Sequence, residues 1–268
     1  KIGGLYADAD LPMVMTTYKQ GGYTLGLGYS RFNDEASTDG SSYKGDLASD
    51  LYVLENTYAF NKDSRVSLVY YLNADNSTTV TNTYTGAVDV VTGLPAVATT
   101  VIAETNKKIN TLALAGQTKI GALDLSGFAA MQKGYSHAGA TKVSYHGWAA
   151  NVLAKMKLGA GQARTGFLFT SGDNTLPGGS NHGWQTINQN GSAVVQNSYN
   201  ESGMMLMVRN TSMGGTSNDF YLRKPITNIA LLHAGYNADL TEKLYANGNV
   251  GMAWLPASRY ERGTAGSN

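Results

Sequence analysis

Five basic side chains stand at positions of one parity inside segments whose other parity is largely apolar. They are Arg65, Lys119, Lys155, Lys157 and Arg164. Asp124 is the one acid expected beside them, and Glu55, Gln117, Gln162 and His233 are expected on the same side. Basic groups that line one side of a water-filled passage raise the local concentration of anions. The pattern therefore predicts electrostatic preference for anions, unless these charges pair with other residues or are simply solvated.

Alternation of apolar and polar residues runs along much of the chain and fixes the side on which these cations lie. In 148–158 and 244–254 nearly every second residue is apolar, whereas helical periodicity is scarce. The alternating runs are about ten residues long, the length that a tilted strand needs to cross a bilayer. Strands of small soluble sheets are about half as long. The runs therefore predict membrane-crossing strands.

Short and long connections alternate strictly between the predicted strands. The short turns are at 20–22, 61–63, 121–122, 159–161 and 239–243, and the long polar connections are at 33–50, 75–106, 135–144 and 172–224. This order is typical of an up-and-down barrel with tight periplasmic turns and long extracellular loops. We predict an all-β fold, a transmembrane up-and-down antiparallel β-barrel, in which residues 1–268 form a single domain.

The strand count sets the expected size of this barrel. About eleven strands are predicted, the first over residues 1–8, and closed bacterial barrels have an even number. We therefore expect a chain truncated at both ends, from a barrel of about 12 to 18 strands when complete. The strand-like run 204–208 would break the alternation, so it is assigned to the loop 172–224. That loop either folds into the lumen, with Arg209, Arg223 and Lys224 at a constriction, or projects as a hairpin.

Composition narrows the class of protein. Charged residues make up 15% of the chain, against roughly 25% in ordinary soluble domains. Mean hydropathy is nevertheless only -0.23, which fits a wall with one face in lipid and the other in water, and also a soluble β-solenoid. A net charge of +1 without a basic stripe argues against nucleic acid. With no cysteine, disulfides, cysteine zinc sites and thiol chemistry are excluded.

Aromatic residues recur near the ends of the predicted strands. Those expected to form girdles at the membrane interfaces are Tyr29, Tyr58, Phe60, Trp148, Tyr236 and Trp254. Ordinary cross-strand packing is the alternative explanation.

Signals for metal binding and catalysis are weak. Asp34, Glu35 and Asp39 in the loop 33–50 offer carboxylates for Ca²⁺, but a solvated acidic loop explains them as well, since no EF-hand spacing is present. The four histidines are dispersed without metal-ligand spacing. The loop 75–106 is rich in Thr, Val and Ala, and is predicted to form a hairpin or to contact a partner. We therefore expect no enzyme activity and no cofactor.

Two segments resemble bacterial outer-membrane porin families, including the alginate-export type. FLFTSGDN at 167–174 ends a predicted strand and opens a long loop, and NADLTEKLYANGNVGMAW at 237–254 is similar to a polar turn followed by a Gly-rich strand. The Gly-Thr step at 263–264 is similar to one that precedes the last strands of such proteins, although the terminal aromatic residue is missing. The resemblance implies a channel for diffusion or export and does not identify a substrate.

The sequence thus predicts an outer-membrane channel for passive diffusion or export of small hydrophilic, preferentially anionic, solutes. Its expected partners are outer-membrane lipid, lipopolysaccharide and these solutes, with a homo-oligomer or a protein partner left open and no nucleic acid. The leading alternative is a barrel scaffold that holds a cytochrome or a surface filament. A barrel enzyme would need an acid–His or Ser–His pair, and a soluble adhesin would need no aromatic girdles.

Overall fold

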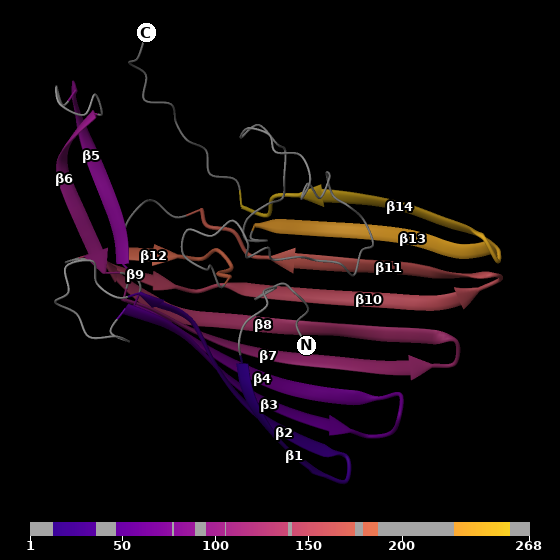
Figure 1. Ribbon diagram of the computed structural model, residues 1–268. Coiled ribbons are helices and arrows are strands. Elements are labelled where there is room, and N and C mark those ends of the chain that lie inside the picture. The colour runs from indigo at the N-terminus through magenta and orange to yellow at the C-terminus, as the bar shows by residue number, and fades with distance from the viewer. Residues whose placement is uncertain are drawn as a thin grey trace.

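The computed structural model describes residues 13–35, 47–76, 78–88, 95–104, 106–138, 141–174, 179–186 and 228–257. All regular elements in this part of the chain are strands (Figure 1). The main path of the sheet consists of β1 (Met13–Gln20), β2 (Tyr23–Glu35), β3 (Leu47–Ala59), β4 (Arg65–Asp75), β7 (Asn106–Ile120), β8 (Leu123–Ala138), β10 (Trp148–Leu158), β11 (Gly161–Thr170), β13 (Ile229–Thr241) and β14 (Leu244–Trp254).

Strands that follow one another along this path pair antiparallel in one 12-stranded sheet. The remaining members are β9 (Thr141–Tyr145), which pairs antiparallel with the loop end of β8, and β12 (Gly179–Asn181), which pairs parallel with β9. The predicted all-β class and the antiparallel up-and-down order are confirmed. In the part of the chain that the structure describes, β1 and β14 each have one neighbour, and no closure into a ring is present. The predicted strand at 1–8 lies outside the described residues.

Tight turns join the strands at one end of the sheet, which we call the turn end. Gly21, Gly121 and Gly159 adopt φ values of 56°, 62° and 59°. Two-residue hairpin turns require this left-handed region, where a Cβ is strained. At the longer turn, the Asp63 amide donates to Asn61 Oδ1 at 2.8 Å. All five predicted short turns lie at this end.

The opposite end, which we call the loop end, carries the longer connections (Figure 1). Within 75–106, β5 (Thr78–Val88) and β6 (Pro95–Glu104) form a separate hairpin that leans away from the sheet, one of the two predicted outcomes. The structure differs from the predicted loop at 135–144, where β8 and β9 form a paired hairpin from Gly134 to Tyr145. Its alternation of polar and aromatic residues suits a strand, so polarity alone was a poor sign of a loop there.

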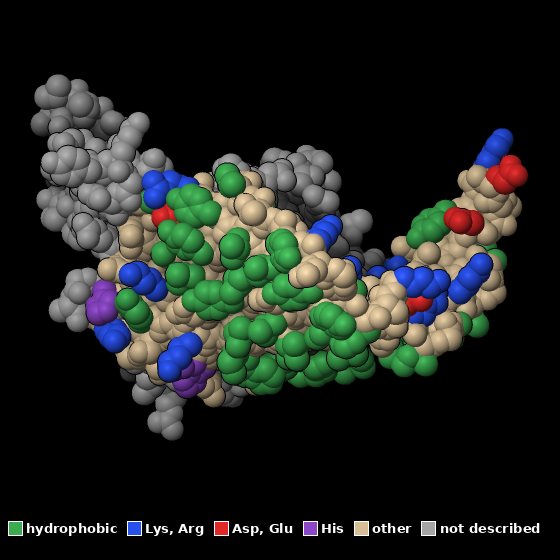
Figure 2. Space-filling model, turned by 90° about the horizontal axis from the view of Figure 1, so that it is seen from below, with side chains coloured by type: hydrophobic (Ala, Val, Ile, Leu, Met, Phe, Trp, Pro, Cys, Tyr) green, Lys and Arg blue, Asp and Glu red, His purple; other side chains and the backbone are tan. Residues whose placement is uncertain are grey.

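The register divides the side chains between two faces. Tyr29, Tyr52 and Leu72 share a row on the face that we call outer, and Ser30, Leu51 and Asn73 share a row on the inner face. The outer face exposes large apolar side chains over every main-path strand, for example Leu114 at 55%, Val152 at 61% and Val250 at 70%. Figure 2 shows hydrophobic side chains gathered in a broad area, with basic side chains towards its margins.

The inner face has two unlike halves. Towards the loop end it carries a buried apolar cluster of Leu51, Val53, Val69, Ala113, Ala130, Ala149, Trp184, Leu168, Ile229 and Leu231, against which Tyr71 and Phe128 pack. Towards the turn end its side chains are polar and basic. Near the turn end the strands thus alternate between apolar outward and polar inward side chains, whereas near the loop end they are apolar on both faces.

Candidate functional site on the inner face

A row of charged side chains crosses the inner face near the turn end. Lys119 on β7 pairs in register with Asp124 on β8, which pairs with Lys155 on β10. Lys155 in turn pairs with Arg164 on β11. Adjacent strands lie about 4.8 Å apart, so four neighbouring strands place three cations and one acid in a single line. We call these four residues the basic row.

The acid in this row does not cancel its positive charge. Asp124 Oδ1 lies 3.8 Å from Lys119 Nζ, and both side chains are about half exposed, at 52% and 47%. An exposed ion pair of this kind contributes little energy. Three cations and one acid leave the row with a formal charge of +2.

Neutral amides hold the Arg164 guanidinium. Nη2 donates to Asn247 Oδ1 at 3.1 Å and to Asn249 Oδ1, and Nη1 donates to Asn237 Oδ1 at 3.5 Å. No described carboxylate forms an ion pair with Arg164. The amides therefore orient the guanidinium and leave its charge intact.

The other two predicted cations flank the basic row. Arg65 Nη2 donates to Gln117 Oε1 at 2.8 Å, one register row towards the loop end. Lys157 pairs with Gln162, one row nearer the turns. The structure thus brings all five predicted cations together on the inner face, with Asp124, Gln117 and Gln162 among them. Glu55 and His233 also lie on this face, and His233 is buried at 1% exposure.

Two components of this face were not predicted from the sequence. Lys19 pairs with Thr24 and lies on the inner face at β1, a position that the outward parity of Tyr18 implied. The amides of Asn237, Asn247 and Asn249 were not assigned a role, although their parity was visible.

The 179–186 segment lies against the inner face at the loop end. Gln132 Nε2 donates to the Gln185 carbonyl and the Gln185 amide donates to Gln132 Oε1, both at 2.7 Å. The Trp184 amide donates to the Ser171 carbonyl at 2.9 Å, and the Trp184 ring is 1% exposed within the apolar cluster. This segment contributes Trp184 to the apolar cluster, and none of its described hydrogen bonds reaches the basic row.

Lys107 joins the segment to the sheet. Its Nζ donates to Gln185 Oε1 at 3.1 Å and lies 4.9 Å from the centroid of the Tyr145 ring. Burial lowers the pKa of Lys107, and the neighbouring Asp75 carboxylate opposes that shift.

Replacing Gly147 with Ala is expected to displace the 179–186 segment. The added Cβ would lie 2.8 Å from Gln132 Oε1, 2.9 Å from Trp184 Cα and 3.0 Å from the Gly183 carbonyl. Overpacking of this kind costs about 1–3 kcal/mol. Acrylamide quenching of Trp184 should rise severalfold in a Trp148→Phe, Trp254→Phe background. Gly248→Ala is the matched control, because nothing lies within 4 Å of its Cβ, and equal quenching in both variants would contradict the placement.

The substitution Gln132→Met is expected to release the Gln185 backbone. It removes the two hydrogen bonds to the Gln185 backbone, worth about 1 kcal/mol each, and also the one from Gln132 Nε2 to Thr111 Oγ1, while keeping the length of the side chain. Hydrogen exchange at the Gln185 amide should become roughly 30-fold faster. Gln117→Met, which removes the Arg65 contact instead, should leave that amide unchanged. We call these two hydrogen bonds the clamp between Gln132 and Gln185. An unchanged exchange rate of the Gln185 amide in Gln132→Met would show that the clamp does not stabilise the position of the segment.

The predicted girdle residues lie at both ends of the outer face, where Tyr29 is half-buried and the other five are exposed. Near the loop end, Tyr29 lies 5.2 Å from Tyr52 between ring centroids, Trp148 stacks on Phe169 at 4.1 Å, and Trp254 lies 6.1 Å from Phe167. Near the turn end, Tyr58 and Phe60 are 5.1 Å apart, and Tyr236 Oη donates to the Leu158 carbonyl. The placement fits interface girdles, and cross-strand ring contacts are present as well.

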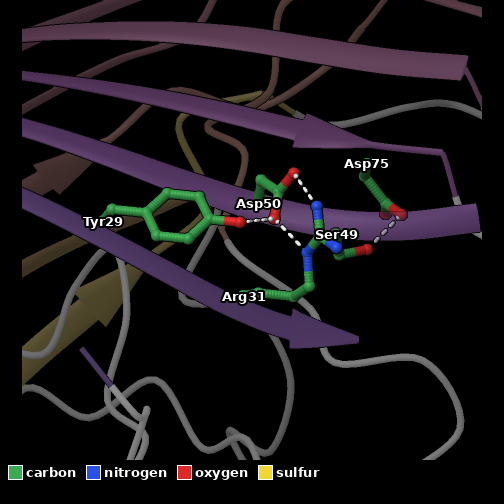
Figure 3. A network of polar contacts seen from close by, with 5 residues as sticks. All are labelled: Tyr29, Arg31, Ser49, Asp50 and Asp75. Carbon is green, nitrogen blue, oxygen red and sulfur yellow. Dashed lines mark hydrogen bonds and ion pairs between the residues drawn. The ribbon is translucent and has the colours of Figure 1, made fainter. Parts of the chain in front are cut away.

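Acids at the loop end of β3 and β4 are held within the sheet (Figure 3). Asp50, on the outer face, accepts from Arg31 Nε at 2.9 Å, from Arg31 Nη2 at 3.2 Å and from Tyr29 Oη at 2.9 Å. Asp75, on the inner face, accepts from Ser49 Oγ at 2.6 Å. Both carboxylates therefore accept hydrogen bonds from side chains of the same sheet.

Some predicted sites cannot be located. Arg209, Arg223, Lys224 and Asp39 lie outside the described residues, as does the run 204–208. Asp34 and Glu35 belong to β2, but their side chains are not described. Among the described residues, no group of three or more His, Asp or Glu could hold a metal ion.

No protein-family model and no curated protein sequence matches this chain. The resemblance to outer-membrane porins therefore rests on the two short segments and the Gly-Thr step alone. In the described part of the chain, no helix is long and apolar enough to cross a membrane.

Proposed function

We propose that this chain forms the wall of a bacterial outer-membrane channel through which small hydrophilic solutes, preferentially anions, pass by diffusion or export. The observation that carries the proposal is the opposition of the two faces. Between its two groups of aromatic residues the outer face exposes large apolar side chains and no charged one, while the inner face carries the basic row. A sheet in water has no reason to expose its apolar parity, whereas a sheet in lipid requires it.

The apolar belt supports a position in lipid. Outward positions of the main-path strands between the two aromatic groups carry no charged side chain. On β10 the outward parity runs from Trp148 to Leu158, and on β14 from Leu244 to Trp254. Ten residue steps span about 33 Å along a strand, or about 25 Å across a membrane at a tilt of about 40°. That height matches the apolar band of outer-membrane barrels.

The inner face supports conduction of anions. Lys119 and Asp124 of the basic row are about half exposed. Arg65 and Lys157 add positive charge in the neighbouring rows of the inner face. Charges that face a narrow aqueous passage bias which ions enter it. The 179–186 segment adds bulk at the loop end, so it would narrow the passage there.

Placement in lipid also constrains the two edges of the sheet. Unpaired backbone groups in hydrocarbon cost several kcal/mol each, so β1 and β14 must find partners. Because β1 and β14 run in opposite directions, they suit pairing with each other or with an even number of intervening strands. We propose a closed barrel of the size predicted above.

The test is reconstitution of the protein in a planar bilayer, with conductance and reversal potential recorded across a salt gradient. Stable open steps with a reversal potential that indicates anion preference would support the proposal. Open steps with cation preference would refute the role of the basic row while leaving the channel. Folded, inserted protein that never conducts would refute the channel.

A specific observation favours a second function, a barrel scaffold that holds a partner protein. The loop-end half of the inner face is apolar, with Leu51, Leu168 and Leu231 between 1% and 3% exposed. Because these side chains are already covered within the chain, this half of the interior is filled and not lined by water, which suits a scaffold with a plugged lumen. The scaffold predicts inserted protein without conductance, so the same recording distinguishes the two functions.

A further inference from the structure

The outer face of β7, β8 and β9 carries four basic side chains just beyond the apolar belt, towards the loop end. We call them the rim patch: Lys108, Lys133, His137 and Lys142. Lys108 pairs in register with Tyr135, Lys133 with Asn110, and His137 with Lys142. The last large apolar residues before the patch are Leu112 on β7 and Met131 on β8, exposed at 42% and 63%. The patch therefore continues the belt without a gap.

No described acid neutralises the rim patch. Asp75, the register partner of Lys107, lies on the inner face. Asp50 lies on β3, two strands from the patch, and accepts hydrogen bonds from Arg31. The three rim lysines form no ion pair with a described residue. Positive charge thus accumulates on one sector of the outer face, where Figure 2 shows basic and histidine side chains beside the hydrophobic area.

Aromatic rings lie within and below the patch. Lys142 Nζ lies 5.4 Å from the centroid of the Tyr135 ring, and Tyr135 is the register partner of Lys108. Trp148, exposed at 52%, pairs with Met131 at the upper limit of the belt. Tyr and Trp favour the headgroup level of a bilayer, and lysine side chains place their ammonium groups at that level. The sector therefore offers cations at headgroup height and apolar surface beneath them.

We propose that the rim patch binds the phosphate of an anionic lipid headgroup in the leaflet around the loop end. The inference rests on the proposed function, because it requires the outer face to lie in lipid. Ammonium groups bind phosphate as point charges, and Lys108, Lys133 and Lys142 lie on three adjacent strands of this sector, in successive rows of its outer face. A lipid suits the site better than a soluble anion, since its acyl chains would lie along Leu112, Met131 and Trp148.

Basic side chains are unevenly distributed among the strands at the loop end of the outer face. On β10, β11, β13 and β14, the outward strand positions nearest the loop end carry Trp148, Phe169, Ala230 and Trp254 and no cation. Anionic lipid should therefore collect beside β7 to β9 and not beside β10 to β14. The patch also identifies the loop end as the end that faces the leaflet richer in phosphate.

The test compares lipid selectivity of the reconstituted protein and two charge-matched variants. Spin-labelled phosphatidic acid and phosphatidylcholine are added to phosphatidylcholine vesicles, and the protein-bound fraction of each is measured by electron paramagnetic resonance. The rim variant combines Lys108→Gln, Lys133→Gln and Lys142→Gln. The control combines Lys119→Gln, Lys155→Gln and Lys157→Gln, which removes the same charge from the inner face.

The wild-type protein and the control are expected to prefer phosphatidic acid by roughly tenfold, and the rim variant to lose most of that preference. The preference should weaken as sodium chloride is raised. Inserted protein with no preference, or with equal preference in the rim variant, would overturn the lipid site while leaving the channel. Absence of a bound fraction for both lipids would instead show that the outer face is not in lipid, and would overturn the channel as well.

Discussion

Replacing Lys119, Lys155 and Arg164 together with glutamine is expected to abolish most of the anion preference of the proposed channel. Each unit charge about 8 Å from a passing ion contributes roughly 0.5 kcal/mol in water, so three contribute roughly 1.5 kcal/mol. Salt of about 0.1 M screens charges beyond about 10 Å and reduces the effect. The permeability ratio of chloride to potassium should therefore fall roughly three- to tenfold, as read from the reversal potential.

The control for this variant is the rim variant, which also removes three cations but from the outer face. Its reversal potential should match that of the wild-type protein. Asp124→Asn provides a second comparison, because it raises the charge of the basic row from +2 to +3 and should increase anion preference. A triple glutamine variant with unchanged selectivity would remove the basic row from the conduction pathway.

Replacing Leu114 with Arg is expected to be strongly destabilising in a bilayer. Leu114 lies on the outer face of β7, within the apolar belt, and is 55% exposed. An arginine near the midplane of an outer-membrane barrel costs about 2–4 kcal/mol. The free energy of unfolding, measured by urea titration in lipid vesicles, should fall by that amount, and the yield of inserted protein should fall with it.

The size of this effect distinguishes lipid from water around the sheet. An exposed Leu to Arg change on a water-facing strand usually stays within about 0.5 kcal/mol. Leu114→Ala is the control, since it removes the same apolar contacts without adding a charge. If Leu114→Arg and Leu114→Ala destabilise the protein equally, the outer face is not in hydrocarbon.

Much of the fold was predictable because its signals are local. Outward and inward parity can be read directly in 148–158 and 244–254, and the structure assigns those faces by register. Glycines at 21, 121 and 159 mark the turns, because the hairpins need a backbone conformation that other residues adopt at a cost. The positions of the five cations followed from these two signals.

The apolar half of the inner face was missed because its strands are apolar on both faces. Leu51 and Val53 face inward, while Tyr52 and Leu54 face outward, so the segment reads as a continuous apolar run. An alternating sequence indicates which face of a strand is apolar, whereas a continuous apolar run does not show that both faces are apolar. What covers the second face cannot be inferred from the strand itself.

The clamp between Gln132 and Gln185 was also beyond prediction. The two residues are 53 positions apart, and each resembles any polar residue of a strand or loop. Their contact depends on Gly147, which leaves room for the 179–186 segment, and on the apolar cluster in which Trp184 is buried. Contacts made by tertiary packing leave no periodic pattern in the sequence.

The central claim is that the outer face lies in lipid and the inner face in water, and spin labels along β10 test it most directly. Because the chain has no cysteine, single cysteines at positions 150 to 157 can each carry a label without a background. In vesicles, labels at Ala150, Val152, Ala154 and Met156 should collide mainly with oxygen, which concentrates in the bilayer. Labels at Lys155 and Lys157 should collide mainly with a water-soluble nickel chelate. Equal access of the chelate to both parities would contradict the account.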